Sequence, residues 1–167
     1  MTMSKNKQEK TSEKILRYAF FSVFGFLLIT IAVTQYNQNG QSFAEEDVLT
    51  VYKSPTCGCC KEWVTHLKEN GFKVKAIDMT NLTKIKEQAG IPPGAGSCHT
   101  AFIEKYAIEG HVPANDIKKL LNEKRDVAGL TVPGMPMGSP GMEGHRVDNY
   151  AVYEFDKQGK LNVVNRY

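Results

Sequence analysis

The amino-acid sequence predicts an α/β domain in residues 45–167, and three observations support this prediction. Short apolar segments typical of strands alternate along the chain with segments whose apolar residues have helical spacing. The 167 residues suffice for one ordinary domain but not for two. Three of the four cysteines form the run Cys57-Gly58-Cys59-Cys60, which closely follows the first expected strand.

The first strand and helix place this cysteine run. Residues 48–52 are expected to form a buried strand, which the break at residues 54–56 ends. Apolar residues from Cys60 to Leu67 then follow at helical spacing, and Asn70-Gly71 stops the helix. The cysteines therefore lie at a helix N-terminus, where unpaired backbone amides and the positive end of the helix dipole stabilise thiolates.

The next elements bring the fourth cysteine back to this turn. Residues 72–77 predict a second strand, and residues 82–89 predict a second helix. Strands at 101–103 and 106–109 form a hairpin, and Pro113 opens a third helix. The order βαβαββα, with cysteines at the first strand-to-helix turn, is the thioredoxin-like plan, in which the loop before the third strand packs against that turn. Cys98 lies in this loop, so the four sulfurs are expected to converge.

The remainder of the chain is expected to add a loop and a hairpin. Residues 127–147 are rich in Gly, Pro and Met. Because so many prolines and glycines are unfavourable in a helix or a central strand, the whole segment is expected to be a loop. Residues 150–155 and 161–165 are expected to form a C-terminal hairpin that extends the sheet.

Residues 1–44 have the pattern of an export signal. Five Lys/Arg and two Asp/Glu precede an uncharged apolar run at residues 18–33, which is the order of a secretory signal. The small residues Ser42 and Ala44 suit cleavage after Ala44. The alternative is an uncleaved anchor that contacts the membrane through residues 18–33. These 16 residues are slightly fewer than the roughly 17–25 that a spanning helix needs. Either way, the domain is expected in the periplasm or on the extracytoplasmic face of the membrane.

The charge of the expected domain argues against nucleic acid as a partner. Residues 45–167 contain 16 Lys/Arg and 16 Asp/Glu, so the formal charge of +3 comes entirely from residues 1–44. A neutral domain lacks the long-range field that attracts phosphate backbones.

The number and spacing of the cysteines favour a soft-metal site. A dithiol redox site needs only Cys-x-x-Cys, which Cys57 and Cys60 supply, so Cys59 and Cys98 are surplus to it. Cu(I) prefers thiolate and thioether sulfur. One alternative is a Cys57–Cys60 disulfide with two unpaired thiols, either structural or in a thiol-disulfide oxidoreductase with Cys57 as nucleophile and Cys60 as resolving thiol. A structural zinc site is a further alternative, but it usually has paired Cys-x-x-Cys motifs.

Three blocks of the chain carry a resemblance to a known family. They are Tyr52-Lys53-Ser54-Pro55-Thr56-Cys57-Gly58-Cys59-Cys60-Lys61, Gly96-Ser97-Cys98-His99-Thr100-Ala101, and Glu109-Gly110-His111-Val112-Pro113-Ala114 followed by Val132-Pro133-Gly134-Met135-Pro136. In these blocks the chain resembles a family of exported bacterial metal-binding proteins, long described as a domain of unknown function, that includes the copper-resistance protein CopG. The resemblance covers nearly all of residues 48–157 and implies a thioredoxin-like fold and copper handling in the cell envelope. It further implies Cu(I) bound by thiolates at Cys57, Cys59, Cys60 and Cys98.

The expected cargo is several Cu(I) ions in a thiolate cluster. Four thiolates carry a charge of −4, which four Cu(I) ions would neutralise, whereas one ion would leave a costly charged site. The partners are then copper ions and other copper-handling proteins of the envelope. His99 and Met135 are candidate additional ligands. His111 and His145 are expected to be solvated or structural. Alternatively, the protein is an oxidoreductase that acts on disulfides or changes the valence of copper.

Overall fold

The computed structural model describes residues 48–167. The predicted export signal or membrane anchor at residues 1–44 lies outside the described residues. Within residues 48–167, no helix is both long and apolar enough to cross a membrane.

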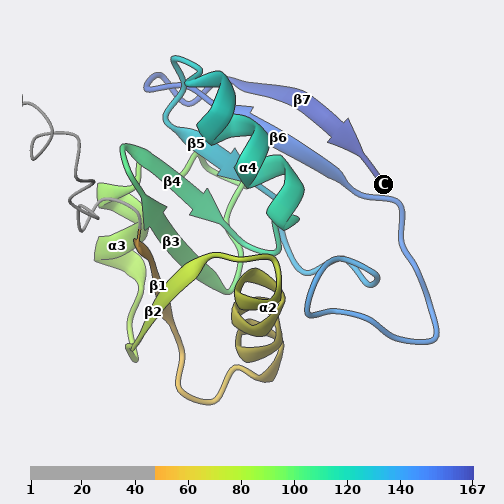
Figure 1. Ribbon diagram of the computed structural model, residues 1–167. Coiled ribbons are helices and arrows are strands. Elements are labelled where there is room, and N and C mark those ends of the chain that lie inside the picture. The colour runs from red at the N-terminus through yellow and green to blue at the C-terminus, as the bar shows by residue number, and fades with distance from the viewer. Residues whose placement is uncertain (1–47) are drawn as a thin grey trace, which may run out of the picture. The chain divides into compact units, whose positions relative to one another are not determined.

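The described chain forms one mixed sheet of seven strands with three helices (Figure 1). The strand order across the sheet is β2-β1-β3-β4-β5-β6-β7. In chain order, the elements are β1 Val48–Lys53, α2 Gly58–Glu69, β2 Lys73–Asp78, α3 Thr83–Gln88, β3 His99–Ile103, β4 Tyr106–Glu109, α4 Ala114–Glu123, β5 Gly129–Thr131, β6 Ala151–Phe155 and β7 Leu161–Arg166.

The sheet confirms the α/β class that the sequence predicts. Strand β1 pairs in parallel with β2 and antiparallel with β3, and β3 pairs antiparallel with β4. The segment from β1 to α4 has the predicted order βαβαββα. This arrangement is compatible with the thioredoxin-like plan.

The two faces of the sheet bury different side chains, because neighbouring residues of a strand point to opposite faces. Ile108 belongs to the main core with Trp63 of α2 and Leu120 of α4. Its neighbour Ala107 packs in a smaller cluster with Ala89, which follows α3. Figure 1 shows α2 and α4 together on the near face of the sheet. Helix α2, which carries three of the cysteines, is therefore fixed by the larger of the two cores.

The prediction that residues 127–147 form only a loop is wrong at Gly129–Thr131. These residues form β5, a fully buried strand between β4 and β6. Gly129 is required there, because a Cβ at this position would lie 1.9 Å from the backbone oxygen of Ala107 on β4. Glycine here permits close approach of two strands. The prolines that suggested a loop begin only at Pro133, after the strand has ended.

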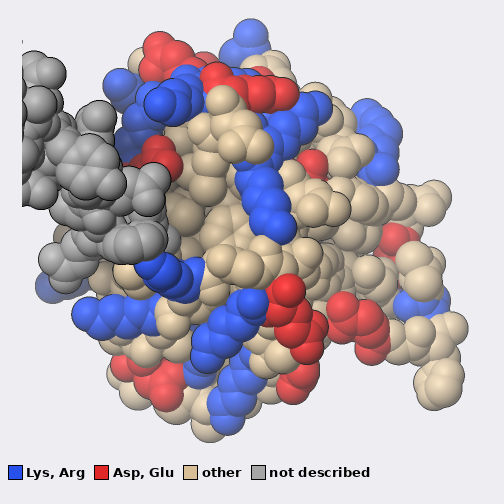
Figure 2. All heavy atoms as spheres, in the orientation of Figure 1, with Lys and Arg blue, Asp and Glu red and all other residues tan. Residues whose placement is uncertain are grey.

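The last two strands form the predicted C-terminal hairpin. Strand β6 pairs antiparallel with β5 on one side and with β7 on the other. The hairpin therefore extends the sheet, as expected, and β5 connects it to the strands that carry the cysteine site. Figure 2 shows basic and acidic side chains interspersed over the face in view, in keeping with the neutral composition of this part of the chain.

Candidate metal centre

The N-cap and first turn of α2 carry the sulfur atoms of Cys57, Cys59 and Cys60. Cys57 is the N-cap residue, and its Sγ accepts a hydrogen bond of 3.3 Å from the backbone N–H of Cys60. The same two residues form a disulfide. Cys59, between them, is a free thiol whose Sγ lies 3.4 Å from that of Cys57.

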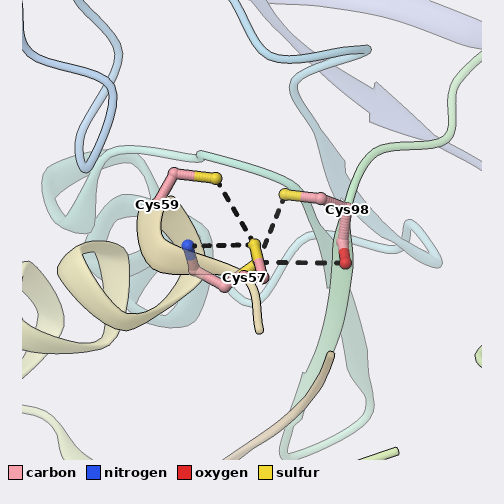
Figure 3. A group of neighbouring side chains, drawn as sticks. Cys57, Cys59 and Cys98 are labelled. Atoms are coloured by element: carbon pink, nitrogen blue, oxygen red, sulfur yellow. Dashed lines mark hydrogen bonds between the residues drawn. A yellow bond between two sulfur atoms is a disulfide. The ribbon is translucent and has the colours of Figure 1, made fainter. Parts of the chain in front are cut away.

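The loop before β3 brings the fourth sulfur to this turn. Cys98 is the residue before β3, and its Sγ lies 3.4 Å from that of Cys60. The four sulfurs of Cys57, Cys59, Cys60 and Cys98 all lie within 4.8 Å of one another. Figure 3 shows the side chains of Cys59 and Cys98 pointing toward the disulfide. The structure thus brings together the four cysteines that the sequence singles out, in the form with one disulfide and two free thiols.

His99 is part of the same cluster. Its side chain is fully buried, its Nδ1 lies 3.4 Å from the Cys98 Sγ, and its ring packs against Trp63 with 4.3 Å between the ring centroids. Its Nε2 is buried and has no hydrogen-bond partner. Nδ1 is the nitrogen that contacts a sulfur, so it is the atom through which His99 could hold a metal ion.

His111 is a site residue that the sequence analysis misses. It is fully buried, so the expectation that it could be solvated is wrong. Its Nδ1 is 2.8 Å from the carbonyl oxygen of Pro140. A carbonyl only accepts hydrogen bonds, so Nδ1 carries the proton and Nε2 has a free lone pair. That Nε2 lies 3.2 Å from the Cys98 Sγ.

The sequence signal for His111 was its place in one of the three family blocks, between Gly110 and Val112. Position in a turn suggested exposure, but this turn is covered by the segment that contains Pro140. Cys98, His99 and His111 form a second group of residues that could hold a metal ion, and it shares Cys98 with the four-sulfur group.

Burial determines the protonation of this cluster in the absence of metal. Desolvation, followed by the nearby Cys59, raises the pKa of the Cys98 thiol to about 11. Desolvation lowers the pKa of His99 to about 3, and His111 adds to this effect. The pKa of His111 is also lowered, mainly by desolvation. At neutral pH the cluster therefore consists of protonated Cys98 beside neutral imidazoles, and neutral imidazole nitrogens are metal ligands.

Met135, the other candidate ligand, is not buried with the sulfurs, since its side chain is 52% exposed. His145 is also exposed. The segment after β5 does reach the site, because a Cβ on Gly141 would lie 2.6 Å from the backbone oxygen of Cys59 and 2.7 Å from the backbone nitrogen of Trp63.

Replacing Gly141 by alanine is therefore expected to lower the free energy of unfolding by about 2 kcal/mol, from its positive φ of 82° and from overpacking against α2. Gly134→Ala is the matched control, since Gly134 also has a positive φ but has open space around it. It is expected to cost about 1 kcal/mol. Urea unfolding measures both values, and equal losses would show that Gly141 does not pack tightly against the cysteine turn.

A buried carboxylate holds the loop that carries Cys98. Glu109 of β4 is fully buried, and its Oε1 accepts hydrogen bonds from the Lys86 ammonium and the Ser97 backbone N–H. Its Oε2 accepts a hydrogen bond of 2.6 Å from the Thr100 hydroxyl. Ser97 and Thr100, the residues on either side of Cys98-His99, thus donate hydrogen bonds to one carboxylate. These hydrogen bonds fix the position of the Cys98 sulfur.

Comparisons with known proteins show which family this chain is similar to. Residues 95–142 match a family model described as "Protein of unknown function, DUF411". Two solved structures, described as the copper resistance protein CopG in forms 1 and 2, are each 45% identical to this chain with a TM-score of 0.68. The similarity covers 72% of this chain and 96% and 97% of those chains. No curated protein matches the sequence.

Proposed function

The chain belongs to the family of the copper resistance protein CopG, and from this membership we propose that it is an exported protein that sequesters or transfers Cu(I). The ligands in this proposal are the sulfurs of Cys57, Cys59, Cys60 and Cys98. Copper is the cargo, and its binding contributes to copper resistance or homeostasis.

The observation that carries the proposal is the convergence of four sulfurs within 4.8 Å. Soft sulfur donors at this density suit Cu(I) and can each bridge two ions. The Nδ1 of His99 and the oriented Nε2 of His111 lie 3.4 Å and 3.2 Å from the Cys98 Sγ and supply imidazole nitrogens beside the same group. The donor set therefore fits copper, with the histidines as additional ligands. Met135 is a weaker candidate because its side chain is half exposed.

Loading requires reduction first, since the disulfide occupies Cys57 and Cys60. An external dithiol would supply the two electrons and two protons that convert this disulfide into two thiols. The four thiols then lose their protons as copper binds, and four Cu(I) ions would balance the resulting charge of −4. We therefore propose a polynuclear site.

The second candidate function is that of an oxidoreductase acting on disulfides, or on copper by changing its valence. The Cys57–Cys60 disulfide at the N-terminus of α2 favours it, because that is the arrangement a dithiol exchange site needs. In that function Cys57 is the nucleophile and Cys60 the resolving thiol.

Export and partners are part of the proposal. The apolar segment at residues 18–33 and the basic residues before it support a location in the periplasm or on the extracytoplasmic face of the membrane. The site would receive copper from, or give it to, other copper-handling proteins of the envelope.

Anaerobic titration of the reduced protein with Cu(I) tests the proposed function. We expect more than one Cu(I) per chain, and we expect Cys59→Ser to reduce the number of ions bound, because it removes a bridging sulfur. His145→Gln is the control, since His145 is exposed and outside the cluster. Saturation of the wild type at one ion would contradict the polynuclear site. Unchanged copper binding in Cys59→Ser together with dithiol reductase activity would favour the oxidoreductase.

A further inference from the structure

The free thiol of Cys98 lies directly against the disulfide and has its own proton acceptor. Its Sγ is 3.4 Å from the Cys60 Sγ and 3.2 Å from the His111 Nε2. The Pro140 carbonyl holds His111 in the tautomer whose Nε2 can accept a proton. The Cys98 thiol, which burial keeps protonated at rest, therefore has a base within hydrogen-bond reach and a group that orients this base.

From this geometry we propose that Cys98 attacks the Cys57–Cys60 disulfide, so that the disulfide exchanges between Cys57–Cys60 and Cys60–Cys98. The Cys98 thiol gives its proton to His111 Nε2 as the Cys98–Cys60 bond forms and the Cys60–Cys57 bond breaks. The bonding electron pair leaves on the Cys57 sulfur as a thiolate, which is then protonated by His111 or solvent. The exchange involves no net oxidation or reduction.

The structure favours attack at Cys60 in two ways. The Cys60 side chain is fully buried, so a thiol from outside the protein cannot reach it, whereas Cys98 is already in contact. The leaving sulfur is that of Cys57, which accepts the N–H of Cys60 at the N-terminus of α2. Amides and the helix dipole stabilise a thiolate at that position.

The other free thiol is less well placed for such an attack. The Cys59 Sγ is 3.4 Å from Cys57, but attack there would expel the buried Cys60 as the thiolate. In the described structure, the two histidines of the cluster contact Cys98 and not Cys59. His99 does so through Nδ1 and His111 through Nε2. Exchange through Cys98 is therefore the route for which the chain supplies a base and a stabilised leaving group.

The exchange decides which sulfurs remain free in the oxidised protein. In the Cys57–Cys60 form, the free thiols are Cys59 and Cys98, which lie on different segments. In the Cys60–Cys98 form they are Cys57 and Cys59, which share one helical turn. The oxidised protein would then keep a Cys-x-Cys pair available for a Cu(I) ion. This consequence rests on the proposed function, but the exchange itself does not require copper.

Peptide mapping of the metal-free, full-length Cys59→Ser protein tests the proposal. Trypsin leaves Cys57 and Cys60 together in residues 54–61 and Cys98 in residues 87–105. The Cys57–Cys60 disulfide stays within one peptide, whereas Cys60–Cys98 joins the two. The Cys59 substitution removes the other sulfur that could join them. Reduced protein is oxidised by one equivalent of diamide, and samples are blocked with N-ethylmaleimide at increasing times before digestion.

We expect both disulfide forms, with their ratio relaxing to a constant value, and maleimide on Cys57 in the joined peptides. Adding His111→Gln is expected to slow the relaxation about 10²-fold, the lower end of a general-base contribution. His145→Gln is the matched control and should relax as the parent does. Circular dichroism checks that each variant is folded. If the His111 variant does not fold, the appearance and relaxation of the joined peptides in the parent still test the exchange.

Absence of the joined peptides, or a ratio that does not change with time, would overturn the exchange. Relaxation of the His111 variant at the parent rate would overturn the role of His111 as base. These results are independent of the copper titration, because no metal is present. A protein that binds several Cu(I) ions but shows no joined peptides would contradict only this inference.

Discussion

Replacing Glu109 by alanine is expected to lower the free energy of unfolding of the metal-free protein by about 3 kcal/mol, the lower end for breaking a buried ion pair. The lower end applies because the Lys86 side chain is 25% exposed and water can partly replace its partner. The Ser97 N–H and the Thr100 hydroxyl also lose their acceptor. An unsatisfied buried donor is costly because nothing replaces the lost hydrogen bond.

Two controls make this prediction specific. Glu109→Gln keeps one acceptor oxygen and the side-chain volume, so its loss should be intermediate. Glu123→Ala removes a carboxylate that is 43% exposed and pairs with Lys119 and Arg125 at the surface. Exposed pairs contribute about 0–1 kcal/mol, so this variant should change little. Urea unfolding at neutral pH measures all three, and a Glu109→Ala loss no larger than that of Glu123→Ala would refute the role of the buried network.

The second large effect is an acid destabilisation that depends on His99. In the folded protein the pKa of His99 is lowered from 6.5 to about 3, first by desolvation and then by the nearby His111 and Lys86. The unfolded chain binds a proton at this histidine as the pH falls below 6.5, whereas the folded chain does not until about pH 3. Stability is therefore fully present above pH 6.5 and decreases as the pH falls.

For the metal-free protein in its disulfide form, this histidine should remove about 3 kcal/mol between pH 6.5 and pH 4, at about 1.4 kcal/mol per pH unit. The measurement is the difference in unfolding free energy between wild type and His99→Gln across that range. The difference should shrink toward low pH, because glutamine does not titrate. His145→Gln, at an exposed position, is the control. A difference that stays constant with pH would show that His99 is not held neutral by burial.

The predicted losses of stability at Glu109 and His99 both concern residues that hold Cys98 in position. Glu109 fixes the chain on either side of Cys98-His99, and His99 fills the space between the Cys98 sulfur and Trp63. The convergence of sulfurs therefore depends on a buried polar network as well as on the apolar core.

Local patterns were enough to predict most of the fold. The period of apolar residues located α2, α3 and α4, and each predicted strand occurs within a few residues of its expected bounds. The exception is β5, where Gly129 and the following prolines suggested a loop. That glycine reflects a close approach to Ala107 on β4, which is a contact between segments far apart in sequence. Local propensity contains no information about such a contact.

The same distinction applies to the site. The sequence alone determined that the cysteine run begins a helix, and the expected strand order placed Cys98 next to it, because both follow from spacing and chain order. Only the tertiary structure decided that His111 lies against Cys98, since its burial and tautomer depend on Pro140, 29 residues away. It also decided that Met135 is half exposed. Residue type and spacing thus specify which sulfurs can meet, whereas packing between distant segments specifies which neutral nitrogen meets them.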